Sequence, residues 1–157
     1  MWSVTDFQRP FGRIITEAMM GLFDRCVDPN LLVRRITVVA NHIMENIVYN
    51  ELLYRGFSVD VGVVEIREKQ PDGKMTRKQL EVDFVANSGS RRYYIQSTFS
   101  MSTPEKEALE KRPFLRFNDS FKKIILVREN IKIRRDENGI VTMGLLDFLL
   151  TPNSLEI

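Results

Sequence analysis

The feature of this sequence that most constrains its fold is a change of hydrophobic period at Gly56. Before Gly56, the apolar residues of 41–55 spread over more than half of a helical wheel, as in a helix that is mostly buried. Asn41 is a good N-cap for such a helix, and glycine commonly ends a helix in the left-handed conformation. After Gly56, the pattern of residues 57–67 predicts a strand. We therefore expect a buried helix to lead directly into a sheet.

The remainder of the chain predicts further elements in a definite order, separated by turn and cap signals. The predicted elements are strands at 79–86 and 91–98, a short helix capped by Ser102 or Thr103 and broken at 111–113, a buried strand at 122–128, a hairpin of 131–135 and 140–143, and a helical turn at 145–150. A helix, three sequential strands, a helix, a strand and a hairpin predict an α/β or α+β fold in which helices cover a sheet.

The first forty residues are expected to form an N-terminal helical extension to a domain at 41–157. Residues 10–25 have the apolar period of an amphipathic helix, and 28–30 predicts a loop after it. Residues 31–40 are rich in β-branched side chains, which is consistent with a strand or with the start of the next helix. The extension is either a native docking helix or the remnant of a longer protein.

Composition and charge exclude several classes of protein. Lys and Arg number 23 against 21 Asp and Glu, and the net charge of +2 predicts neither a strong nucleic-acid binder nor a membrane-surface protein, although a local basic patch remains open. The single cysteine, Cys26, and the single histidine, His42, exclude an internal disulfide and a zinc site of the usual ligand count. No apolar run reaches the roughly 18 residues that span a bilayer. Because residues 1–6 also lack a signal-peptide pattern, we expect a cytoplasmic protein without a membrane partner.

Two acidic residues of the predicted strand 79–86 are expected to share one face of the sheet. Alternation places Glu81 and Asp83 on this face and the apolar residues at even positions on the other. If the turn at 87–90 pairs Ala86 with Arg91, the next strand runs back beside this one. Polar side chains of the following strand then lie beside the acidic face.

The predicted strand 91–98 supplies that polar neighbour. In the same register Asp83 lies opposite Tyr94, and Gln96 and Thr98 follow on the same surface. The preceding helix can bring Glu45 towards this face. The sequence therefore predicts a cluster of carboxylate, amide and hydroxyl groups on one side of the sheet.

This layout resembles the PD-(D/E)xK nuclease superfamily, which has a helical glutamate, an aspartate on one strand and Glu-x-Lys on the next. The resemblance implies a restriction-endonuclease-like mixed sheet and hydrolysis in which carboxylates hold Mg²⁺ while the lysine activates water. The matching positions are Glu45, Asp83, Gln96 and Thr98, with Asp83, Glu45 and Glu81 as the candidate metal ligands. Gln96 adds no negative charge and Thr98 replaces the lysine, so the implied site is degenerate. Lys106 and Lys122 are the candidates for a relocated lysine.

Four segments taken together resemble a more specific family. They are His42–Leu52, Leu80–Ala86, Tyr93–Gln96 and Gly144–Leu150. This combination is similar to the C-terminal domain of unknown function in a family of prokaryotic AAA-type ATPases, over about residues 41–150. In that family an ATPase module and a winged-helix segment precede the domain. Neither is evident in this sequence, so we expect a stand-alone or truncated copy.

The resemblance implies a non-catalytic accessory domain of a bacterial AAA-type ATPase that recognises a protein partner or nucleic acid. Because the sequence has no Gly-x-x-x-x-Gly-Lys-Ser/Thr loop, the chain is not expected to hydrolyse ATP itself. An active Mg²⁺-dependent nuclease and a pure protein-interaction module remain alternatives. Mg²⁺ is expected as a cofactor only if the degenerate site still binds metal, and the oligomeric state is open.

Several of these residues also have simpler structural interpretations. Glu51 competes with Glu45 for the role of the helical acid, but Arg55 four residues later predicts an ion pair instead. Tyr93 and Tyr94 are expected to pack across strands. Three basic pairs can contact phosphates or simply face solvent: Arg91-Arg92, Lys122-Lys123 and Arg134-Arg135.

Overall fold

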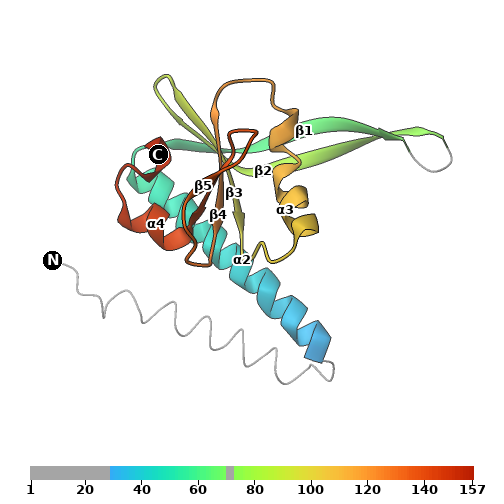
Figure 1. Cartoon of the computed structure of the whole chain (residues 1–157), viewed down its shortest axis with the longest axis horizontal. Coiled ribbons are helices and arrows are strands. Elements are labelled where there is room, and N and C mark those ends of the chain that lie inside the picture. Colours follow the sequence, from blue (N-terminus) through green and yellow to red (C-terminus); the bar gives the residue numbers. More distant parts are fainter. Residues whose placement is uncertain (1–28, 70–72) are drawn as a thin grey trace. The chain divides into compact units, whose positions relative to one another are not determined.

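The computed structural model describes residues 29–69 and 73–157 (Figure 1). The chain divides into two compact units, Met1–Ala40 and Asn41–Ile157, and the second contains the sheet. The helix predicted at 10–25 and Cys26 lie outside the described residues.

The described elements follow the predicted order (Figure 1). They are α2 (Pro29–Tyr54), β1 (Ser58–Lys69), β2 (Met75–Ser88), β3 (Arg91–Thr98), α3 (Pro104–Lys111), β4 (Lys122–Val127), β5 (Arg134–Arg135), β6 (Val141–Gly144) and α4 (Leu145–Leu150), with 3-10 turns at Phe114–Arg116 and Ser154–Glu156. An α/β fold with a mixed sheet flanked by helices is therefore confirmed. The predicted strand at 91–98 has the bounds of β3, and Thr103 rather than Ser102 caps α3.

The strands of the described chain form one six-stranded mixed sheet in the order β1-β2-β3-β4-β6-β5. The first three strands are antiparallel neighbours, whereas β4 is parallel to both β3 and β6. A parallel neighbour needs a crossover connection, and α3 supplies it between β3 and β4. The short strand β5 closes the sheet as an antiparallel hairpin with β6, as predicted around Asn138-Gly139.

Helix α2 is longer than the sequence suggested. It begins at Pro29, so residues 29–40 are helical. The loop expected at 28–30 is therefore wrong for Pro29 and Asn30. Asn41 lies inside the helix and is not its N-cap. β-branched residues lower helix propensity only slightly, so they do not stop a helix that is already formed. The predicted end is confirmed, because the Gly56 and Phe57 N–H groups donate to the Leu53 and Leu52 carbonyls, 2.9 and 3.1 Å away.

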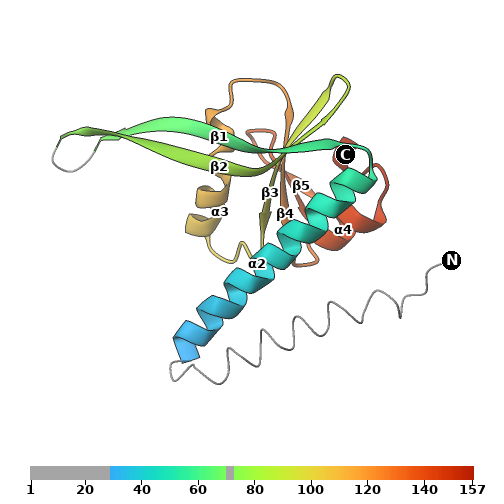
Figure 2. The same ribbon diagram turned by 180° about the vertical axis from the view of Figure 1, so that it is seen from behind.

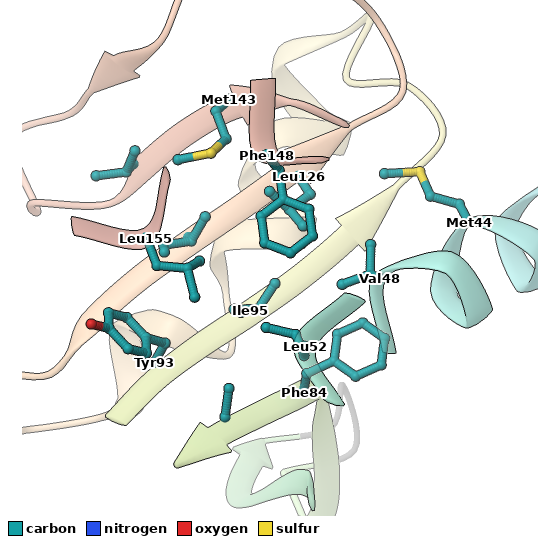
Figure 3. Packing of buried hydrophobic residues seen from close by; sticks show 13 residues of the cluster. Met44, Val48, Leu52, Phe84, Tyr93, Ile95, Leu126, Met143, Phe148 and Leu155 are labelled. Atoms are coloured by element: carbon teal, nitrogen blue, oxygen red, sulfur yellow. The ribbon is translucent and has the colours of Figure 1, made fainter. Parts of the chain in front are cut away.

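Two apolar clusters cover the two faces of the sheet. On one face, α2 and α4 pack against the strands (Figure 2 and Figure 3). This cluster comprises Met44, Val48, Leu52, Phe84, Ala86, Tyr93, Ile95, Ile124, Leu126, Val141, Met143, Phe148 and Leu155. On the other face, the segment after α3 packs on the sheet with Val82, Tyr94, Phe114, Ile125, Val127 and Ile140. The strand β4 contributes to both clusters because it is buried on both sides.

Arg55 joins the end of α2 to the C-terminal segment. Its guanidinium donates to Glu51 at 2.7 Å, which confirms the predicted ion pair, and also to the Phe148 carbonyl at 2.5 Å and the Ser154 hydroxyl at 2.9 Å. The same group lies over the Phe148 ring. Arg55 therefore stabilises the packing of α2 against α4 and the last residues.

The predicted alternation along β2 is wrong because the strand contains a β-bulge. Asp60 pairs with Val85 but Gly62 pairs with Val82, so Asp83 and Phe84 together lie opposite Val61. The extra residue reverses the faces beyond it. As a result Val82 packs on the α3 side with its neighbour Val85, while Phe84 packs on the α2 side.

The predicted register between β2 and β3 is also wrong. Ser88 pairs with Arg91, which leaves Gly89 and Ser90 as a two-residue turn in which Gly89 has a φ of +60°. Val85, rather than Asp83, therefore lies opposite Tyr94. This shift moves Asp83 two residues along β3, towards Gln96.

Candidate functional site

Asp83 lies where β2 separates from β3. The last paired residues are Phe84 and Ile95, and Asp83 is the next residue of β2, within the bulge. Its carboxylate spans the gap: Oδ2 accepts hydrogen bonds from the Ser97 backbone N–H at 2.7 Å and the Ser97 hydroxyl at 3.2 Å, and Oδ1 accepts from Gln96 Nε2 at 2.9 Å. The side chain thus replaces the backbone acceptor that β3 loses when the ladder ends.

Burial raises the pKa of the Asp83 carboxyl from 3.8 to about 6. The hydrogen bonds from Ser97 oppose this rise, while the negative charges of Glu45 and Glu110 add to it. Glu110, on α3, has a raised pKa for the same primary reason, its own burial. Acids on α2 and on α3 therefore both act on the Asp83 carboxyl.

A shallow hollow of about 410 Å³ opens beside Asp83 on the α2 side of the sheet. Its lining residues are Glu45, Asn46, Tyr49, Val61, Glu81, Asp83 and Phe84. Glu45 is partly exposed and lies 3.2 Å from the Nδ1 atom of His42. The structure thus brings the predicted acids Glu45, Glu81 and Asp83 around a common hollow, although Glu81 is exposed to solvent.

Thr98 supplies no cation to this site. Its side chain is 3% exposed, its hydroxyl donates to the Ser100 carbonyl at 3.3 Å, and its hydrogen bond with Glu110 partly offsets the raised pKa of that acid. The positive charge of Lys106, one turn earlier on α3, also lowers the pKa of Glu110. Lys106 is therefore the lysine that approaches the Thr98 side of the sheet.

The other candidate lysine, Lys122, lies at the opposite end of the strands. It pairs with Tyr93, five residues before Thr98 on β3, a separation of roughly 17 Å along a strand. Its ammonium group donates to the Leu155 and Ile157 carbonyls at 2.9 and 2.6 Å. Lys122 therefore holds the C-terminal segment and does not reach Asp83.

The arrangement around Asp83 does not fit a Mg²⁺ ion. Three donors occupy three of the roughly four lone-pair positions that a carboxylate offers. Gln96 presents its NH₂ group to Asp83, and its Oε1 atom is buried without a hydrogen-bond partner. Among the described residues no three His, Cys, Asp or Glu side chains are grouped so that they could hold a metal. Asp83 acts here as a structural acceptor.

Sequence reasoning missed Ser97 and Glu110. Ser97 matters through its backbone N–H, and a backbone donor has no signature in the sequence. Glu110 is one of several acids on a short helix, and nothing in the local pattern separates it from Glu105 or Glu107. Only the position of α3 over the sheet brings Glu110 to Thr98.

The three basic pairs singled out in the sequence have partners within the protein. These contacts are Arg91 with Glu156, Arg92 with Asn87, Lys122 with the Leu155 and Ile157 carbonyls, Lys123 with Asp119, Arg134 with Glu107, and Arg135 with the Ile157 carbonyl. Tyr93 and Tyr94 are buried, with their hydroxyls bonded to Glu156 and Asp119. One residue of each basic pair, namely Arg91, Lys123 and Arg134, is therefore ion-paired with an acid, and the other donates to an amide or to backbone carbonyls.

Comparisons with known proteins define the chain only coarsely. No protein-family model matches it, and no solved structure matches it. The chain is similar to an uncharacterized protein of Haemophilus influenzae, with 29% identity over 139 residues, which is 88% of this chain and 30% of the relative. The chain thus spans less than a third of that relative's length. None of the described helices is long and apolar enough to cross a membrane.

Proposed function

We propose that residues 41–157 form a non-catalytic accessory domain of PD-(D/E)xK type, which serves recognition for an AAA-type ATPase. The observation that supports this proposal best is the bonding of Asp83. The carboxylate at the expected metal position accepts three hydrogen bonds from Ser97 and Gln96, and Thr98 occupies the expected lysine position. A domain with this site keeps the framework of a nuclease without its hydrolytic groups.

The order of the elements supports the restriction-endonuclease-like fold. A helix, three antiparallel strands, a crossover helix and a parallel strand are the elements from α2 to β4. The acid on the helix, Glu45, and the acid on the second strand, Asp83, border the same hollow. This is the juxtaposition that the resemblance implies for the superfamily.

The chemistry of the site supports the loss of catalysis. Metal-assisted hydrolysis needs a metal held by carboxylates and a cation or proton carrier beside the attacking water. Gln96 brings no charge, its NH₂ group bonds Asp83, and Thr98 is a buried hydroxyl. Without these groups the charge that develops in the transition state has nothing to stabilise it.

The similarity to part of a longer protein supports an accessory role. The matched region covers 30% of the Haemophilus influenzae relative, so in that protein the similar region is accompanied by other sequence. This chain has no phosphate-binding loop of the P-loop type. In this proposal the ATPase partner therefore supplies nucleotide hydrolysis from outside these 157 residues.

The proposal is tested by a cleavage assay on single- and double-stranded DNA and RNA with Mg²⁺ or Mn²⁺. Wild type, Asp83→Ala and Asp83→Asn are compared, with circular dichroism to show that each variant is folded. We expect no metal-dependent cleavage above the background shared by all three proteins. Cleavage by wild type that both substitutions abolish would overturn the non-catalytic assignment.

A second candidate function, an active nuclease with a relocated lysine, is favoured by the position of Lys106. Its charge acts on Glu110, which in turn bonds Thr98, so a cation and an acid lie on the α3 side of β3. In this case Lys106→Ala and Glu110→Gln would both abolish cleavage. If wild type cleaves and neither substitution changes the cleavage, this second candidate fails.

A further inference from the structure

The hairpin of β1 and β2 extends beyond the rest of the sheet as a two-stranded arm (Figure 1). Only residues 84–88 of β2 pair with β3, whereas β1 and β2 continue to pair from Gly62 and Val82 out to Lys69 and Met75. We define the arm as residues 61–69 and 75–82. Its inner side is attached to the body, because Glu68 forms an ion pair with Arg112 and Ile66 is buried.

The outer side of the arm is exposed and holds a pair of like charges. Arg67 and Arg77 are direct cross-strand partners, and both are exposed. Residues directly opposite on one face have Cβ atoms about 5 Å apart, and like charges there destabilise the hairpin. Neither guanidinium has an acidic partner within the described part of the chain. The protein therefore maintains a local repulsion that a bound anion would relieve.

Positive residues outnumber acidic ones at the tip of this hairpin. Residues 66–78 contain five Lys or Arg and two Asp or Glu, a net charge of +3, while the full chain has +2. The other 144 residues therefore have a net charge of −1. The whole hairpin, residues 61–82, has a net charge of +1 because Glu65 and Glu81 lie nearer its base, so the excess of positive charge is confined to the tip. On the body, one residue of each basic pair is ion-paired with an acid.

The exposed apolar side chains on the arm indicate which class of anion it can bind. Val63 and Met75 are exposed, and Val63 lies on the same side as Arg67, four residues further along β1. A polyanion with apolar surfaces between its charges complements such a face, and nucleic acid has sugars and bases between its phosphates. A two-stranded ribbon also fits the major groove of duplex DNA, which is about 12 Å wide.

We propose that the arm binds nucleic acid, with Arg67 and Arg77 donating to backbone phosphates. Forked guanidinium donors match phosphate oxygens in pairs, and both arginines lie on the same exposed side of the arm. This inference rests on the proposed recognition role and names its ligand class. It does not depend on the Asp83 hollow, which lies at the base of the arm and has an acidic lining.

The test measures the binding of the full chain to a fluorescently labelled DNA duplex by anisotropy over a range of salt concentrations. The test variant is the double substitution Arg67→Gln, Arg77→Gln. The matched control is Arg116→Gln, Lys132→Gln, which removes two exposed positive charges outside the arm. Urea unfolding of both variants shows whether either substitution changes stability.

We expect the arm variant to lose at least about tenfold in affinity and to reduce the slope of log K against log salt by about 2. The control should lose less than about threefold and should keep the slope of wild type. The arm variant should be at least as stable as wild type, because the repulsion between the two guanidinium groups is removed.

Three results would overturn the arm proposal: no binding of wild type to duplex or single-stranded probes at low salt, equal losses in the arm and control variants, or tighter binding of a poly-glutamate peptide to the same residues. The last result would identify an acidic protein as the partner instead. These failures are distinct from failure of the non-catalytic assignment, which requires cleavage that depends on Asp83.

Discussion

Substitution of Asp83 by asparagine provides a test of how the site is built. The new amide has the shape of the carboxylate, so its oxygen can still accept the Ser97 N–H. If the Gln96 amide turns over, the new NH₂ group can donate to Oε1 of Gln96, which is buried without a partner. The substitution therefore removes the ionisation of Asp83 while it leaves the geometry of the gap between β2 and β3 nearly unchanged.

The raised pKa of Asp83 determines how strongly its ionisation changes the free energy of unfolding. A pKa of about 6 in the folded protein against 3.8 for the ordinary group is a difference of about two units, or about 3 kcal/mol when the group is fully ionised. Because the folded pKa is raised, the stabilising contribution is complete below pH 3.8 and is lost as the pH rises through about 6. At about pH 4.5 the unfolded chain is already largely ionised, so the loss between about pH 4.5 and 7.5 is about 2 kcal/mol.

The assay is urea unfolding of wild type and Asp83→Asn at these two pH values. The stability of the variant relative to wild type should increase by about 2 kcal/mol from the lower to the higher pH. Glu81→Gln is the control for loss of one charge from an exposed position on the same strand, and its effect should stay within about 0.5 kcal/mol at both values. If Asp83→Asn is instead less stable than wild type at about pH 7.5, the ionised carboxylate stabilises the fold and the reasoning is refuted.

Three further substitutions, with Leu53→Ala as a control, test the packing. A Cβ added by Gly62→Ala would lie 2.9 Å from Val85 Cγ2, so thermal unfolding should show a loss of about 1–3 kcal/mol. Leu52→Ala removes a side chain that is 0% exposed and should cost about 2–5 kcal/mol in urea unfolding, whereas Leu53→Ala, at 44% exposed, should cost less than about 1 kcal/mol. Arg55→Met removes the donor to the Ser154 hydroxyl and the ion-pair partner of Glu51, while the Phe148 carbonyl keeps the Ser154 hydroxyl as a donor, so it should cost about 2–3 kcal/mol and speed amide exchange in residues 154–157.

The parts of the fold that the sequence predicted well are those that depend on local chemistry. The end of α2 at Gly56 follows from the ability of glycine to adopt positive φ, which is 82° here. The start of α3 follows from Thr103, whose hydroxyl accepts the Lys106 N–H. In both cases the residues that determine the structure lie within one helical turn of the feature.

The candidate site was predicted only in part, because its geometry depends on contacts between distant segments. The sequence singled out Asp83, Gln96 and Glu45, and the first two are hydrogen-bonded while the third borders the same hollow. The expected common face was wrong, since a bulge against Val61 shifts the pattern of β2 by one residue. Periodicity cannot locate a bulge, because both alternations before and after it are regular.

The sequence by itself determined the order of the elements, the class of the fold and the absence of a lysine at position 98, since periodicity, caps and residue identity are local properties. The tertiary structure alone decided that Asp83 bonds the backbone of Ser97, that one residue of each basic pair on the body is paired with an acid, and that Arg67 faces Arg77 on the arm. These features arise from strand register and from the need to satisfy backbone donors, and both are settled only when segments distant in the chain come together.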